Sequence, residues 1–276
     1  MLTTNRSPGE LLRDWRMRRR MSQLDLACEA EISSKHLSFV ETGRSSPSRD
    51  MILHLCETLD VPLRERNRVL VAGGFAPAYP GRCLDDPALD AARTAVERVL
   101  AGHEPFPAIA IDRHWTLVSA NTAIGFFLQS VDPALLEPPV NVLRLSLDPR
   151  GLAPRIANLA EWRDHLFARL EAQIAATADP VLEALLAELQ ALPVPAGQPA
   201  PPSGGHSDVF VPLQVVGPAG IMSFLSTTTV FGTPIDITLS ELAIEAFFPA
   251  DPATAGALQA MAAGAGRRAG SCWQER

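Results

Sequence analysis

The sequence predicts an α+β protein in which a small all-helical domain is followed by a larger α/β domain. Residues 8–72 contain short amphipathic segments at helical spacing, whereas residues 106–249 include apolar runs and alternations typical of strands. A Pro-rich linker at residues 76–87 separates the two patterns. With 276 residues, 47% of them hydrophobic, the chain can form two cores. We therefore assign residues 1–75 to the helical domain and residues 88–263 to the α/β domain.

The helical domain begins with a segment predicted to run from Pro8 to Arg20. Proline is favourable in a first helical turn, and Leu12 and Trp15 follow at helical spacing as core residues. Two later helices are expected over residues 49–59 and 63–72, because Pro62 interrupts the pattern between them and Gly73-Gly74 ends the second.

Two short apolar-periodic segments lie between these helices and meet at a turn near Glu31. Ser33 is a favourable N-cap for the second segment, in which Leu37 and Val40 form an inward-facing seam. Gly43 then supplies a left-handed C-cap. Two helices of this length joined by a turn of three to four residues are typical of a helix-turn-helix.

Several residues in register resemble the phage-repressor-type (Cro/C1, or XRE) helix-turn-helix family over residues 8–72: Arg16, Gln23, Leu26-Ala27, Ile32-Ser33, Glu41-x-Gly43 and Pro47. The resemblance implies a five-helix lambda-repressor-like fold, an ion pair between Arg16 and Glu41, and binding to double-stranded operator DNA. A homodimer is expected because one recognition helix rarely gives enough affinity alone. Glu31 departs from the family, which has Gly in the turn, and a positive φ at a non-Gly residue costs about 1 kcal/mol.

The second helix of the motif is expected to enter the major groove, where its N-terminal residues reach base edges. Its polar side faces away from Leu37 and Val40, and Lys35 is the only lysine of the chain. Because the net charge is −7, DNA contact must come from such a local patch. Basic and polar residues nearby are expected to hold phosphates. The predicted DNA-contacting residues are Arg16, Arg19, Gln23, Ser33, Ser34, Lys35, His36, Ser38, Arg44 and Ser45.

The second domain mixes predicted helices and strands. Helices are expected over residues 87–100, 159–176, 180–192 and 251–263, and after Asn121, which can cap the helix that follows it. Strands are expected at 108–111, at 116–118, in a hairpin of 209–216 with 221–231, and in the alternating stretch 239–249. The Pro-rich segment 193–206 is expected to be flexible, and residues 264–276 are expected to form a disordered tail.

Three blocks of residues 88–262 resemble the MmyB-like ligand-binding domain: PAIAIDRHWTLVSAN, NVLRLSLDP followed by the Trp162 helix, and STTTVFGTPIDITLSELAIEAFFPAD. The resemblance implies a PAS-like sheet with flanking helices around a small apolar ligand, with a fatty acid as the best guess. An apolar pocket with few polar anchors would suit such a ligand. The predicted pocket residues are Ile109, Ile111, Trp115, Asn121, Phe127, Trp162, His165, Leu166, Arg169, Phe210 and Phe224.

The sequence carries no pattern that predicts catalysis or a bound metal or cofactor. It has no GxSxG, GxxxxGK[ST], GxGxxG or HExxH motif, and neither the histidines nor the cysteines have metal-ligand spacing. Separated thiols, no signal-peptide core and no long apolar run favour a cytoplasmic protein. Two alternatives to a ligand-responsive DNA-binding regulator remain: a C-terminal domain used only for dimerisation or partner recruitment, and a helix-turn-helix that contacts protein.

Overall fold

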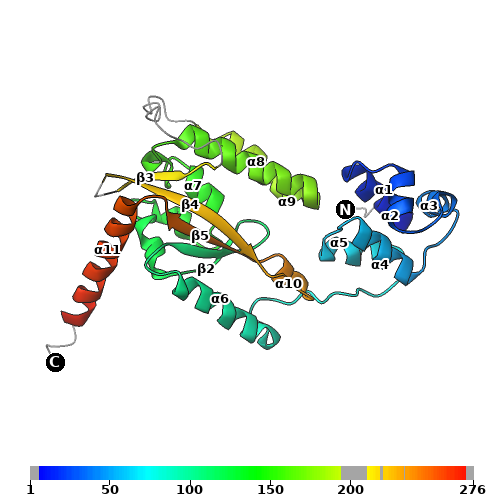
Figure 1. Cartoon of the computed structure of the whole chain (residues 1–276), viewed down its shortest axis with the longest axis horizontal. Helices are drawn as coiled ribbons and strands as arrows, with labels where there is room; N and C mark the ends of the chain where they lie inside the picture. Colours follow the sequence, from blue (N-terminus) through cyan, green and yellow to red (C-terminus); the bar gives the residue numbers. More distant parts are fainter. Residues whose placement is uncertain (1–5, 194–209, 218–219, 233, 272–276) are drawn as a thin grey trace. The chain divides into compact units, whose positions relative to one another are not determined.

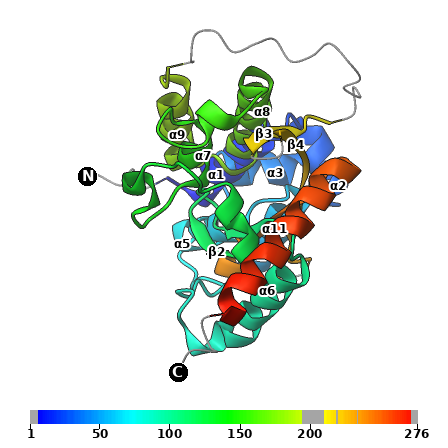
Figure 2. The same cartoon turned by 90° about the vertical axis from the view of Figure 1, so that its left-hand side faces the viewer.

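The computed structural model describes residues 6–193, 210–217, 220–232 and 234–271. The chain forms two compact units (Figures 1 and 2). The first comprises Met1–Cys83 with Ala175–Ala178 and Thr233–Ser240, and the second comprises Leu84–Ile174, Asp179–Gly232 and Glu241–Arg276. The prediction of an all-helical domain followed by a mixed α/β domain is confirmed.

The helical part of the first unit packs around a single apolar core. Leu12, Leu26, Leu37 and Leu70 are fully buried in it. Gly9 allows the first and third helices to approach closely, because a Cβ atom there would lie 2.0 Å from the carbonyl oxygen of Val40. Its helices are α1 (Pro8–Arg18), α2 (Gln23–Glu29), α3 (Ser34–Glu41), α4 (Arg49–Thr58) and α5 (Leu63–Ala72).

Serine caps explain where the first four of these helices begin. Ser7 forms a capping box with Glu10 and is followed by Pro8 in the first turn of α1. Ser33 and Ser48 accept hydrogen bonds from backbone amides in the first turns of α3 and α4. Helix α1 ends at Arg18, earlier than predicted, because Arg20 has a φ of 56° and turns the chain toward α2.

The predicted linker is irregular but is held by hydrogen bonds. Asn67 of α5 accepts from the backbone amide of Ala78 at 2.9 Å and donates to the carbonyl of Tyr79 at 2.7 Å. Farther along, Arg82 forms an ion pair of 2.7 Å with Asp236, whose carboxylate is buried. The carbonyl of Pro80 also accepts from the amide of Ile237. The segment 234–240 therefore belongs to the first unit although it is distant in sequence.

The second unit is built on one antiparallel sheet of order β2-β1-β5-β4-β3. Strand β5 lies in its middle, pairing Ile244 with Ala110 of β1 and Glu245 with Thr228 of β4. The strands are β1 (Ala108–Ile111), β2 (Leu117–Ala120), β3 (Leu213–Gly217), β4 (Gly220–Val230) and β5 (Ala243–Pro249).

Helices cover both faces of the central strands (Figure 1). Val96 and Leu100 of α6 (Asp90–Gly102) pack against Ala110 and Ile244 on one face. The other face carries a larger core covered by α7 (Val142–Leu147), α8 (Leu159–Thr177) and α9 (Pro180–Gln190). The remaining elements are η1 (Pro87–Leu89), η2 (Thr122–Phe126), η3 (Pro133–Leu136), η4 (Ala153–Arg155), α10 (Ile237–Ser240) and α11 (Pro252–Ser271).

Two details of the second unit differ from the prediction. Asn121 does not cap the following element, which is the short 3-10 helix η2. Its buried side chain instead donates to the carbonyls of Leu100 and Phe106 and accepts from the amide of Ala108, so it ties α6 to β1. The helix predicted to end at residue 263 continues to Ser271 as α11, and the stretch that follows residue 263 contains no proline to interrupt it.

Some predictions fall outside the described residues. These are residues 194–206 of the Pro-rich segment, the first residue of the predicted hairpin (209), its turn residues 218–219, and residues 272–276 of the predicted tail. None of the helices within the described part of the chain is long and apolar enough to cross a membrane.

Replacing Glu31 with glycine is expected to stabilise the protein by about 1 kcal/mol. Glu31 has a φ of 53°, and its carboxylate follows the C-terminus of α2, where negative charge is unfavourable. Urea unfolding of the full chain measures the change. Glu31→Ala is the matched control, because it removes the charge but keeps the strain. If Glu31→Gly and Glu31→Ala were equally stable, the positive φ at this position would not destabilise the protein.

Candidate functional site

The helix-turn-helix is formed by α2 and α3 and is held by their shared apolar seam. Leu26 and Ala27 of α2 are buried against Leu37 and Val40 of α3. The turn between the helices runs through Glu31 in the left-handed region, as the sequence predicted. The amide of Ile32 donates to the carbonyl of Ala27, which closes the end of α2.

The N-terminal part of α3 presents a polar surface. Ser34 and Lys35 are exposed, and His36 and Ser38 are half-buried. The Lys35 ammonium lies 5.8 Å from the Phe39 ring centroid, and the Arg44 guanidinium lies 6.0 Å from the same ring. This surface therefore combines two exposed cations with short hydrogen-bonding side chains, which is the chemistry that base edges and phosphates require.

Other predicted DNA-contacting residues are engaged within the protein. Arg16 is buried and donates to both carboxylate oxygens of Glu41, at 2.6 and 2.9 Å. Gln23, expected at a phosphate, donates its amide to Glu41 at 2.7 Å. Arg19 donates to the carbonyls of Leu59 and Asp60 at the end of α4. The Arg16–Glu41 pair braces α1 against α3, as the resemblance implied.

The remaining two side chains of that group lie beside α3. Ser33 is exposed, and its hydroxyl accepts from the backbone amide of His36. Ser45 is half-buried just after Arg44, and its amide donates to the carbonyl of Phe39. The exposed residues of this region thus form one patch at the start of α3 and just beyond its end.

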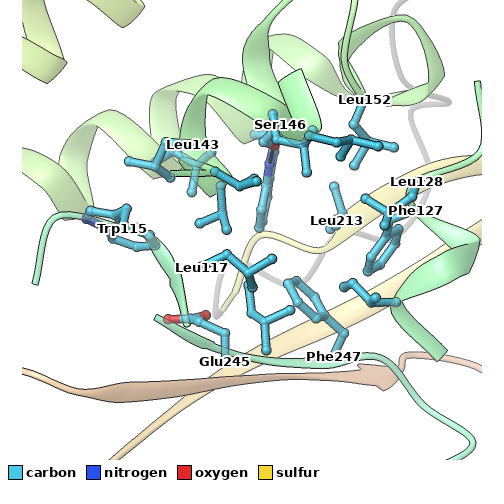
Figure 3. A pocket seen from close by; sticks show the side chains of 18 of the residues that line it. Trp115, Leu117, Phe127, Leu128, Leu143, Ser146, Leu152, Leu213, Glu245 and Phe247 are labelled. Atoms are coloured by element: carbon cyan, nitrogen blue, oxygen red, sulfur yellow. Dashed lines mark hydrogen bonds between the residues drawn. The ribbon is translucent and has the colours of Figure 1, made fainter. Parts of the chain in front are cut away.

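The second unit contains a cavity of about 260 Å³ between the sheet and helices α7 and α8 (Figure 3). Phe247 and Leu117 lie on the strand side, and Leu143, Leu145 and Trp162 lie on the helical side. Such a volume lies just below the usual range for small-molecule sites, and an almost entirely apolar wall suits a hydrocarbon group.

The structure brings part of the predicted pocket set together at this wall: Ile109, Trp115, Phe127, Trp162, Leu166 and Arg169. Ile111 and Phe224 are buried in the adjoining core, and Asn121 is occupied by backbone groups. His165 stacks on Trp162 with a centroid distance of 5.3 Å, and Phe210 is 46% exposed. None of these five residues lines the cavity.

One corner of the cavity carries an ion pair. Arg169 of α8 donates to Glu245 of β5 at 2.5 Å and to the hydroxyl of Thr228 at 3.0 Å. The guanidinium also lies 4.9 Å from the ring centroid of Trp115. Glu245 is only 3% exposed, so its charge is tolerated because Arg169 and Thr228 satisfy it.

The sequence prediction missed several residues of this wall. Phe247 and Glu245 alternate with the buried Ile244 along β5, and a carboxylate within such a strand was the available signal. Ser146 accepts from the indole nitrogen of Trp162 at 3.1 Å. The residues contributed by η3, α7 and the segment between them had no strong periodicity: Leu136, Val140, Val142, Leu143, Leu145 and Ser146. Among the residues whose positions are described, no cluster of potential metal ligands occurs.

Two protein families match this chain. The MmyB-like transcription regulator ligand binding domain matches residues 92–261, which is more than half of the chain. The helix-turn-helix domain matches residues 9–69, which include the patch on α3. A comparison with curated proteins finds none of significant similarity.

Replacing Glu41 with glutamine is expected to destabilise the helical unit by about 3–5 kcal/mol, because it leaves the Arg16 charge buried without a counter-charge. Thermal unfolding followed by circular dichroism measures the loss. Glu29→Gln removes an exposed carboxylate from α2 and should leave the transition unchanged. A Glu41→Gln protein as stable as this control would show that the pair does not brace the helices.

Proposed function

Because this chain belongs to the MmyB-like transcription regulators, we propose that it binds operator DNA through α3 and that a small apolar ligand in the cavity modulates this binding. The observation that carries the proposal is the apolar cavity in the same chain as an exposed helix-turn-helix surface. The proposed ligand has an aliphatic body, since nearly all of the lining side chains are hydrocarbon.

In this proposal, Ser34, Lys35 and His36 face base edges, and Arg44 and Ser45 contact phosphates. The capped N-terminus of α3 supports the orientation, because recognition helices contact bases mainly with their first residues. The proposed active form is a cytoplasmic homodimer, since two copies of α3 would contact half-sites roughly 34 Å apart and one short helix gives few contacts.

The segment that precedes β5 offers a route by which ligand binding could affect DNA binding. Glu245 and Phe247 of β5 line the cavity, and the segment that precedes β5 is bonded to the linker through Asp236 and Ile237. A ligand that shifts β5 would therefore act on the linker that follows α5. To change operator affinity, it must bind one arrangement of the dimer more tightly than another.

Replacing Lys35 with alanine is expected to weaken operator binding by about 1–3 kcal/mol, because the ammonium is exposed at the start of α3. The operator is first selected from a random DNA pool, and affinities are then compared by fluorescence anisotropy at fixed salt. Arg68→Ala is the matched control, since it removes an exposed cation from α5 that is paired with Glu65. Unchanged affinity of Lys35→Ala would contradict the proposed interface.

Replacing the half-buried Leu136 with tryptophan is expected to fill one side of the cavity and to abolish ligand-induced stabilisation. A ligand at a hundred times its dissociation constant should stabilise the wild-type protein by about 2.7 kcal/mol. Thermal shift with decyl-chain amphiphiles measures this effect. Operator binding without ligand should be the same in both proteins. If the ligand stabilised the wild-type protein and the Leu136→Trp variant equally, the ligand would bind outside this cavity. If it stabilised neither protein, the result would favour a C-terminal domain that serves only for dimerisation.

A further inference from the structure

The polar corner of the cavity combines one cation and one anion. Arg169 and Glu245 are the charged residues among the described side chains that line it, and they neutralise each other at 2.5 Å. Thr228 adds a hydrogen bond of 2.7 Å to the Glu245 carboxylate. The corner therefore has hydrogen-bonding groups but no net charge.

Among the described residues that line the cavity, Arg169 is the one cation. His165 lies one turn from Arg169 on α8 and stacks on Trp162. Burial, together with the neighbouring Arg169 charge, lowers the pKa of His165. The imidazole is therefore neutral at neutral pH and cannot balance a negative ligand.

The ion pair leaves one donor and one acceptor incompletely used. The Nε–H of Arg169 has no acceptor among the described residues, because the hydrogen bonds from its guanidinium to Glu245 and Thr228 use Nη1 and Nη2. Glu245 Oε1 makes the two short bonds, whereas Oε2 has only a long contact of 3.4 Å with Nη1. A ligand group that both accepts and donates a hydrogen bond would complement this arrangement.

These features discriminate between head groups. A carboxylate would lose its hydration on entering the cavity and would meet Glu245 as well as Arg169, so no net attraction offsets the loss. A hydroxyl group can accept from Arg169 and donate to Glu245 at a much smaller desolvation cost. We propose that the ligand is an uncharged amphiphile, an aliphatic chain with a hydroxyl head, and not a fatty-acid anion. This inference rests on the proposed function and names the class of ligand.

The test compares three probes with the same chain: decyl alcohol, methyl decanoate and decanoate. Trp115 and Trp162 line the cavity, so intrinsic tryptophan fluorescence reports binding to the full-length protein. At neutral pH decyl alcohol is expected to bind at least about tenfold more tightly than decanoate. The ester should lie between them, because it can accept from Arg169 but cannot donate to Glu245.

A pH titration of the wild-type protein provides a second measurement that needs no variant. Carboxyl groups of this kind have a pKa of about 4 to 5, and only the protonated acid is uncharged. The apparent dissociation constant of decanoic acid should therefore rise about tenfold for each pH unit between about pH 5.5 and about pH 7.5. That of decyl alcohol should stay constant over the same range.

Glu245→Gln is expected to reverse the preference, because it leaves the Arg169 charge available to a ligand anion. Decanoate should then bind at least about tenfold more tightly than to the wild type, while the alcohol changes only slightly. Glu183→Gln, which removes an exposed carboxylate from α9 outside the cavity, should keep the wild-type order. If Glu245→Gln does not fold, the pH titration decides the question.

Wild-type protein that binds decanoate as tightly as decyl alcohol at neutral pH would overturn the uncharged head group and leave the proposed function intact. A decanoate affinity independent of pH would have the same consequence. Failure of all three probes to bind would overturn both this inference and the proposed ligand-binding function.

Discussion

β5 runs through the middle of the sheet, and it is buried on one face at Ile244 and on the other at Glu245. Ile244 packs against α6, while Phe247 and Glu245 point into the cavity on the opposite face. A strand in this position must satisfy any charge that it carries, because water cannot do so. The Arg169–Glu245 pair meets this requirement by joining α8 to β5 across the cavity. The same two residues are the charged side chains among the described residues that line the cavity, so this pair also fixes the polarity of the cavity wall.

The helical unit uses a comparable arrangement for a different purpose. Glu41, at the end of α3, accepts from both Arg16 and Gln23, so three helices are fixed by one buried carboxylate. Two side chains predicted to contact DNA, Arg16 and Gln23, are thereby used to orient α3. The residues left exposed are those near its N-terminus, above all Lys35, and those just after its C-terminus. The small size of this patch is consistent with the acidic net charge of the chain, which offers little non-specific attraction to DNA.

The segment between β4 and β5 belongs to the first unit, although it directly precedes the strand that carries Glu245. It carries the buried Asp236, which pairs with Arg82 in the linker after α5. Proline in this linker already restricts its backbone, because Pro-rich segments are semi-rigid. Here Asn67 and the segment 234–240 hydrogen-bond to it at Ala78, Tyr79 and Pro80.

The sequence by itself determined the elements whose formation depends on neighbouring residues. Helix caps such as Ser33, the turn at Glu31 and the alternation of β5 could be predicted because they follow from local backbone geometry and periodicity. The resemblance also predicted the Arg16–Glu41 pair. Only the tertiary structure decided which side chains line the cavity, because η3, α7 and β5 are distant in the sequence and have no shared pattern. The pairing of Arg169 with Glu245 and the use of Arg19 and Gln23 inside the fold were likewise set by packing, which brings partners together across long separations.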